Sequence, residues 1–144
     1  MAVLQVKNLI TTFDVPGNTV TAVDDISFDV GKGRTVGIVG ESGSGKSVTS
    51  LSIMRLLPKP MGQSTGEIIF EGENILDLPA KSMLKIRGRK FAMIFQEPMT
   101  ALNPVHTIGE QLMETYLLHF PNMKRAEAFA KSVEMLEKVG IPAP

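Results

Sequence analysis

Cysteine is absent from this chain of 144 residues, which excludes disulfides and thiolate metal sites and fits a reducing compartment. A net charge is also missing: 15 basic residues balance 15 acidic ones, so charge gives no reason to expect nucleic acid or anionic lipid as a partner. No apolar run approaches the length of a membrane span, and residues 1–7 alternate like a strand instead of forming a leader. With 43% hydrophobic residues, the composition predicts a soluble, non-secreted domain, or part of one.

Histidine is scarce and methionine is frequent, but neither pattern indicates a metal site. The two histidines, His106 and His119, do not stand at ligand spacing, and the nine methionines do not cluster. We expect the histidines to be solvated or hydrogen-bonded and the methionines to fill the core and interfaces.

One stretch organises the rest of the chain. Residues 40–47 read GESGSGKS and fit the pattern G-x-x-x-x-G-K-[ST] at every fixed position. The stretch lies between a strand-like apolar run at 35–39 and a helix-like run at 48–57, which is the setting that a phosphate-binding loop requires. The residues predicted to hold phosphate are Gly40, Ser42, Gly43, Ser44, Gly45, Lys46 and Ser47.

The residue types of this loop suit a nucleoside triphosphate with Mg²⁺. The three glycines are expected to take positive φ, so that backbone N–H groups curl around phosphate oxygens. Lys46 can reach the β- and γ-phosphates, and the Ser47 hydroxyl can ligate Mg²⁺. The positive end of the helix that follows faces the same anion.

Periodicity predicts the remaining elements. Strands are expected at 3–13, with Leu4, Val6 and Leu9 inward, and at 19–30, with a turn at 16–18 between them. Segments 36–39 and 91–95 are apolar on both faces and are expected to be buried strands of a parallel sheet. Residues 61–65 are expected to be a linker, 66–74 a short strand and turn, and 80–86 a short helix.

Two further helices are expected after the second apolar strand. Thr107 with Glu110 predicts a capping box, followed by an apolar face of Ile108, Leu112, Tyr116 and Phe120. Asn122 is expected to cap the last helix, and Gly140 to end it. Its predicted buried stripe is Ala126, Phe129 or Ala130, Val133 and Leu136, and its solvated face pairs Glu127 with Lys131 and Glu134 with Lys138.

The order of these segments resembles the ATP-binding subunit of ABC transporters. Besides the loop, Gln96 ends an apolar run about fifty residues later, where this family has the glutamine that reaches Mg²⁺ and the attacking water. Residues 95–104, which read FQEPMTALNP, resemble the dipeptide, oligopeptide and nickel importers of that family. The resemblance implies that Gln96 acts with Lys46 in catalysis and with Ser47 at the metal.

The resemblance also implies an architecture and partners. The fold would be α/β, of the P-loop NTPase (ABC ATPase) type, and incomplete: residues 1–97 would hold an antiparallel β subdomain and part of the parallel-sheet core, and 98–144 the start of the helical subdomain. The partners would be permease subunits, contacted by the loop 98–104 and the helices after it, a second ATP-binding subunit and, indirectly, a solute-binding protein. The protein would be located, as a peripheral subunit, at the cytoplasmic face of a prokaryotic membrane.

The aromatic Phe13 matches the residue that stacks on adenine in this family, with Val20 beside the ring. Stacking tolerates different bases, so the preference for ATP over GTP would be weak. Both residues also have a purely structural interpretation. On that interpretation Phe13 only fills space in the antiparallel sheet, and Gln96 is a polar residue at the end of a strand, hydrogen-bonded to nearby backbone.

Three features of the family have no match in this sequence: the Ser-Gly-Gly signature, the apolar run ending in Asp-Glu, and the later switch histidine. Phosphoryl transfer depends on such groups, so we expect nucleotide binding without efficient hydrolysis. The chain would be a fragment of a longer subunit, or a partner chain would cover its unpaired strand edges. The alternatives are a non-catalytic nucleotide-binding module and, less well supported, a self-contained kinase or GTPase, which would need its own acidic Mg²⁺ ligand.

Overall fold

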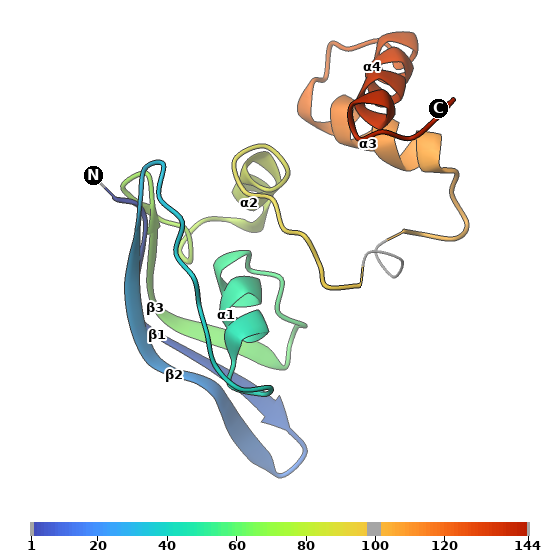
Figure 1. The fold of residues 1–144 in the computed structure, drawn as a ribbon. Coiled ribbons are helices and arrows are strands. Elements are labelled where there is room, and N and C mark those ends of the chain that lie inside the picture. The colour runs from blue at the N-terminus through green and yellow to red at the C-terminus, as the bar shows by residue number, and fades with distance from the viewer. Residues whose placement is uncertain (1, 98–101, 144) are drawn as a thin grey trace. The chain divides into compact units, whose positions relative to one another are not determined.

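The computed structural model describes residues 2–97 and 102–143, which form two compact units (Figure 1). One unit ends at Met83 and the other begins at Leu84. The predicted domain boundary at 97 falls inside the second unit and stays a prediction. Of the predicted partner-facing loop 98–104, residues 98–101 lie outside the described part of the chain.

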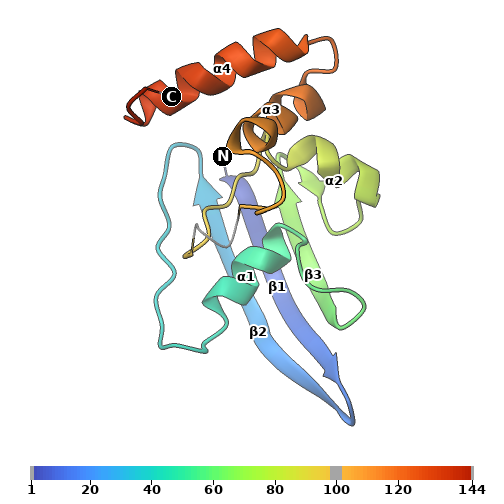
Figure 2. The ribbon, with the colours of Figure 1, turned by 90° about the vertical axis from the view of Figure 1, so that its right-hand side faces the viewer.

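The first unit is an antiparallel sheet with a helix on one face (Figure 2). Its strands are β1 (Ala2–Val15), β2 (Asn18–Gly31), β3 (Gly62–Phe70) and β4 (Glu73–Asn74), in the order β2-β1-β3-β4. The predicted hairpin of β1 and β2 is confirmed, with its turn at Pro16 and Gly17. β3 begins earlier than predicted, because residues 62–65 of the expected linker pair with β1 opposite residues 10–13.

A bulge in β1 changes which of its side chains are buried. Val6 and Leu9 are both buried although they are three residues apart, because Asn8 between them takes φ 47° and shifts the register with both neighbouring strands. Asp25 of β2 takes φ 46° nearby, and its carboxylate accepts a 2.8 Å hydrogen bond from the Asn8 side chain. Asn and Asp tolerate this backbone conformation better than other residues with a Cβ. Simple alternation therefore fails at this point, and Thr11 becomes the next inward residue.

Helix α1 (Lys46–Ile53) is shorter than the predicted run to Leu57. It ends in a Schellman motif: the Leu56 N–H donates to the Leu51 carbonyl, and the N–H of Arg55, at φ 52°, donates to the Ser52 carbonyl. The Arg55 guanidinium donates to the carbonyls of Ile75 and Leu78, which holds this conformation in place. The buried residues of α1 are Thr49 and Ser52, whereas the apolar residues Val48, Leu51 and Met54 are only half-buried.

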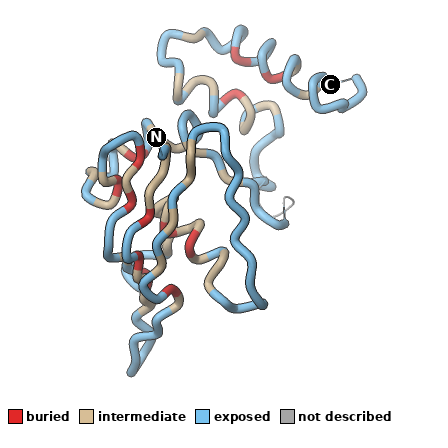
Figure 3. The backbone as a smooth tube through the Cα atoms, turned by 60° about the vertical axis from the view of Figure 1, so that its left-hand side comes forward, coloured by how far each residue is buried: buried red, intermediate tan, exposed pale blue. Residues whose placement is uncertain are grey.

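The two predicted parallel strands do not form. Residues 34–40 are irregular, and of 91–95 only Phe91 makes an isolated bridge, to Arg87. Val39 is 92% exposed and Ile94 is 95% exposed. A strand is held by hydrogen bonds to a neighbour, and none of the sheet's strands pairs with either segment, so the prediction of buried strands is wrong for the described chain. In the burial view, the whole stretch 32–44 is exposed (Figure 3).

Three more helices follow: α2 (Ala80–Ile86), α3 (Ile108–His119) and α4 (Arg125–Lys138). The helix at 80–86 and the capping box of Thr107 and Glu110 are confirmed, as is the end of α4 at Gly140, which takes φ 81°. The N-cap of α4 is Lys124 rather than Asn122. The predicted apolar faces were partly wrong, because Met113 is the buried residue of α3, Ala128 and Ser132 are those of α4, and Ile108, Phe120, Ala126, Phe129 and Ala130 are exposed.

Candidate functional site

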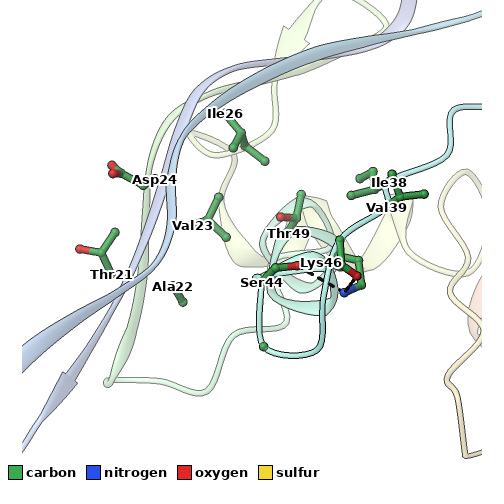
Figure 4. A pocket seen from close by; sticks show the side chains of 12 residues that line it. Thr21, Ala22, Val23, Asp24, Ile26, Ile38, Val39, Ser44, Lys46 and Thr49 are labelled. Carbon is green, nitrogen blue, oxygen red and sulfur yellow. Dashed lines mark hydrogen bonds between the residues drawn. The ribbon is translucent and has the colours of Figure 1, made fainter.

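A pocket of about 490 Å³ in the first unit is lined in part by four residues of the predicted loop (Figure 4). One wall is β2, and the other is the stretch 38–46 with the first turns of α1. Figure 4 shows Val23 and Ile26 projecting from β2 toward the loop, whereas Asp24 projects from the other side of the strand. The carboxylate of Asp24 is therefore turned away from the place where an anion would lie. The pocket is lined by Thr21, Ala22, Val23, Asp24, Ile26, Ile38, Val39, Gly40, Gly43, Ser44, Lys46 and Thr49.

The side chain of Lys46 folds back into the loop that precedes it. Its Nζ donates to the Gly40 carbonyl at 2.8 Å, to the Glu41 carbonyl and to the Ser44 hydroxyl at 3.3 Å. An ammonium group in the middle of a curled backbone is a positive charge that a phosphate oxygen can share with these acceptors. The loop therefore presents a cation held in place by three oxygen atoms.

The three loop glycines differ in their backbone geometry. Gly43 and Gly45 take φ values of 82° and 85°, as predicted. Gly40 does not take positive φ, so the prediction was wrong there. A Cβ at position 40 would lie 2.6 Å from the Ser44 hydroxyl oxygen, so a larger residue there would require the Ser44 side chain to rotate. At Gly45 a Cβ would overlap the Ala22 carbonyl oxygen, which brings the end of the loop against β2.

Gly45 is also the N-cap of α1, and no side chain caps this helix start. The first N–H groups of an α-helix lack partners within the helix, and the helix dipole makes this end positive. A helix N-terminus of this kind is a favourable binding site for a phosphate group. Ser47 lies in this first turn and is exposed, as is Ser42 in the loop, so both hydroxyls are accessible to a ligand or to a phosphate-bound Mg²⁺.

Phe13 and Val20 lie opposite one another on β1 and β2. Phe13 is half-buried, and its ring edge lies against Gly62 of β3, where a Cβ would come within 3.1 Å of Phe13 Cε1. Val20 is 46% exposed. The pair lies one step along the hairpin from the pocket residue Thr21, although neither lines the pocket itself. Their role at a base stays a prediction.

Gln96 is an exposed residue of the second unit, in the irregular segment before the end of the first described range. Its predicted place beside Mg²⁺ stays a prediction. Among residues 2–97 and 102–143, no cluster of three His, Asp or Glu side chains could hold a metal ion by itself.

Sequence reasoning missed the contribution of β2 to the pocket. A Cβ on Gly45 would overlap the Ala22 carbonyl oxygen and contact the Val23 side chain. Thr49 donates a 3.0 Å hydrogen bond to the Gly45 carbonyl. The available signal was the spacing Gly45, Thr49, Ser52, which places small and hydroxyl residues on one face of the helix.

The comparison with protein families decides the identity of the fold. The model of the ABC transporter family matches residues 23–143, which is most of the chain. The chain belongs to the ABC transporter family. The chain is similar in sequence to curated members of the family. It is 50% identical over 141 residues to the oligopeptide transport ATP-binding protein OppD of Escherichia coli, and 46% identical over 140 residues to the dipeptide transport ATP-binding protein DppD of Lactococcus lactis.

These matches cover 98% and 97% of this chain but 41% and 40% of the relatives, so the chain spans about two fifths of their length. Among solved structures, the dimeric cassette MJ0796, a bacterial ABC transporter cassette, is similar with a TM-score of 0.78 and 25% identity, over 93% of this chain and 56% of that one. The predicted ABC ATPase fold class is thereby confirmed. Across the described residues, no helix is both long and apolar enough for a membrane span.

Proposed function

We propose that this ABC transporter family member is the triphosphate-binding portion of the ATP-binding subunit of a peptide importer. The observation that carries the proposal is the Lys46 ammonium held within the loop 40–47, at the uncapped start of α1. A cation and free helix N–H groups on one concave backbone suit a polyphosphate. The importer specificity is supported by the curated relatives, which are named as oligopeptide and dipeptide transport proteins. Nickel is the other solute that residues 95–104 imply.

In this proposal each loop residue has a separate task. The backbone N–H groups of residues 43–47 bind phosphate oxygens, and Lys46 exchanges its loop carbonyls for the β- and γ-phosphates. Ser47 supplies a hydroxyl ligand to Mg²⁺, which would neutralise phosphate charge when bound. Phe13 stacks on the base with Val20 at its edge, which fits their pairing across β1 and β2. Gln96 would contribute to the shell of the metal and the attacking water.

The partners follow from the same family role. We infer that the permease subunits bind the second unit, that a second ATP-binding subunit completes the catalytic site, and that a solute-binding protein acts indirectly. The chain would then work as a peripheral protein at the cytoplasmic face of a prokaryotic membrane.

A second candidate function is nucleotide binding without turnover. It is favoured by the sequence, because residues 1–144 contain neither a Ser-Gly-Gly signature nor an apolar run ending in Asp-Glu. Loss of the groups that position water and stabilise transition-state charge lowers the rate by orders of magnitude, while ground-state binding by the loop can persist.

Phosphate release and ATP binding by the purified chain separate the two functions. We expect Mg²⁺-dependent binding of ATP. We expect phosphate release to be no faster than about 10⁻³ of the turnover number of a typical enzyme. Gln96→Ala should leave ATP affinity within about twofold, because one exposed neutral side chain contributes little to binding. Sustained turnover by the chain alone would contradict the binding-only role, and absence of ATP binding would contradict both functions.

A further inference from the structure

The face of α1 that lies on the sheet is polar instead of apolar. Thr11 of β1 and Ser52 of α1 are 0% and 1% exposed, and their hydroxyl oxygens lie 2.8 Å apart. The Thr11 hydroxyl oxygen also lies 3.0 Å from that of Ser64 on β3. Three elements therefore meet at one cluster of hydroxyl groups, and no hydroxyl of this cluster lacks a partner.

The directions of these hydrogen bonds are fixed by the number of protons. Each hydroxyl has one proton to donate. Ser52 donates to the Val48 carbonyl at 2.8 Å, so it must accept from Thr11. Thr11 then has no proton left for Ser64, and Ser64 must donate to Thr11. The hydroxyl chain runs in one direction, from Ser64 through Thr11 and Ser52 to the backbone of α1.

This hydroxyl chain restricts the position of α1 on the sheet more tightly than apolar packing would. Hydrophobic contact is non-directional, whereas hydrogen bonds weaken steeply with distance and angle. The second fixed point of α1 is its N-cap, where Gly45 lies against the Ala22 carbonyl oxygen. Together the two contacts set both the rotation of α1 and its position along the sheet.

The hydroxyl chain joins strand β1 to helix α1, and these two elements carry the two halves of the proposed nucleotide site. Lys46 and Ser47 begin α1, and Phe13 lies two residues after Thr11 on β1. We propose that the Ser64, Thr11 and Ser52 hydroxyl chain is a positioning device that sets the phosphate-binding loop at the right separation from the base-stacking strand. This inference rests on the proposed function.

Comparing two ligands tests the inference, because only one of them spans both halves of the site. ATP contacts the loop and β1, whereas inorganic tripolyphosphate contacts the loop alone. Thr11→Val keeps the shape of the side chain but removes the hydroxyl and interrupts the chain. We expect its dissociation constant for Mg²⁺-ATP to rise about three- to tenfold, and that for tripolyphosphate to change by less than about twofold.

Two further variants separate positioning from general destabilisation. Thr11→Ser retains the hydroxyl and should restore ATP affinity to within about twofold of wild type. Ser50→Ala is the matched control on α1, because the Ser50 hydroxyl bonds only within the helix, to the Lys46 carbonyl. If Thr11→Val fails to fold, Ser52→Ala removes the hydroxyl of α1 that accepts from Thr11 and should give the same selective loss.

The outcomes distinguish the inference from the proposed function. Equal weakening of ATP and tripolyphosphate by Thr11→Val, or no change in either, overturns the positioning role. A wild-type chain that binds neither ligand overturns the proposed function and the inference with it. A wild-type chain that binds ATP no more tightly than tripolyphosphate overturns the stacking of Phe13 on the base and the inference, but not phosphate binding by the loop. Selective loss of ATP affinity with rescue by Thr11→Ser supports both.

Discussion

At the scale of single residues, Gly43 and Gly45 separate two reasons for glycine in one loop. Both take positive φ, at 82° and 85°. A Cβ on Gly43 would meet open space, whereas a Cβ on Gly45 would overlap the Ala22 carbonyl of β2. Gly43 is therefore required only by the backbone conformation, whereas Gly45 is also required by the close approach of the loop to the sheet.

Alanine substitutions at the two positions should differ in their effect on stability. Gly43→Ala should lower the free energy of unfolding by about 1 kcal/mol, the cost of positive φ for a residue with a Cβ. Gly45→Ala should lower it by about 2–4 kcal/mol, because overpacking against backbone adds to that cost. Urea unfolding followed by circular dichroism measures both. Equal losses would contradict the contact between Gly45 and β2.

At the scale of elements, the N-terminus of α3 depends on one carboxylate. The Glu110 side chain accepts hydrogen bonds from the Thr107 N–H at 3.1 Å and from the Thr107 hydroxyl at 3.0 Å. These bonds, the backbone one first, hold the pKa of Glu110 below its ordinary value of 4.5. A lowered pKa in the folded state means that ionised Glu110 stabilises the fold above about pH 4.5, and that this contribution is lost as the pH falls through the lowered pKa.

The variant Glu110→Gln should therefore be less stable than wild type at pH 7, and the difference should disappear at a pH below the lowered pKa of Glu110. Thermal unfolding at a series of pH values measures this gap. Glu114→Gln, at an exposed position of the same helix, is the matched control and should show no such gap. A stability difference for Glu110→Gln that persists at a pH below the lowered pKa of Glu110 would rule out the carboxylate as its source.

The irregular course of residues 91–95 gives a second test at this scale. Ile94 is 95% exposed, whereas Ile68 of β3 is 0% exposed. Ile68→Ala should lower the free energy of unfolding by about 2–5 kcal/mol, the usual cost of emptying a core site. Ile94→Ala should change it by less than about 0.5 kcal/mol. A large loss at Ile94 would show that this segment is a buried strand after all.

Local signals predicted the elements that depend on local chemistry. The hairpin turn, the capping box of α3 and the end of α4 at Gly140 all rest on residues close in sequence, and all three are confirmed. The buried strands at 36–39 and 91–95 were wrong because an apolar run specifies burial only when another strand pairs with it. The pattern could not say whether such a partner is present.

Within the candidate site the same division holds. The loop from Gly40 to Ser47 was predictable because its pattern is contiguous in the sequence. The approach of Ala22 to Gly45 and the hydroxyl contact of Thr11 with Ser52 were not, since they join residues that only the folded sheet brings together. The alternation of β1 also breaks at Asn8, so Thr11 could not be identified as an inward residue from the strand period alone.

At the scale of the whole molecule, the chain is an ABC transporter family member that spans about two fifths of the length of its curated relatives. Its first unit holds the loop, the pocket and the hydroxyl chain, and its second unit holds Gln96. The proposed division of labour follows: ATP affinity should depend on residues of the first unit and be largely insensitive to Gln96.

Isothermal titration calorimetry with Mg²⁺-ATP on three versions of the chain tests the central claim most directly. The wild type and Lys32→Ala, which removes an exposed cation outside the pocket, should bind with dissociation constants within about twofold of one another, as expected for a solvated surface charge. Lys46→Ala should show no measurable binding, because it removes the charge-assisted hydrogen bonds to the phosphates. Equal affinity of the wild type and Lys46→Ala would contradict the account.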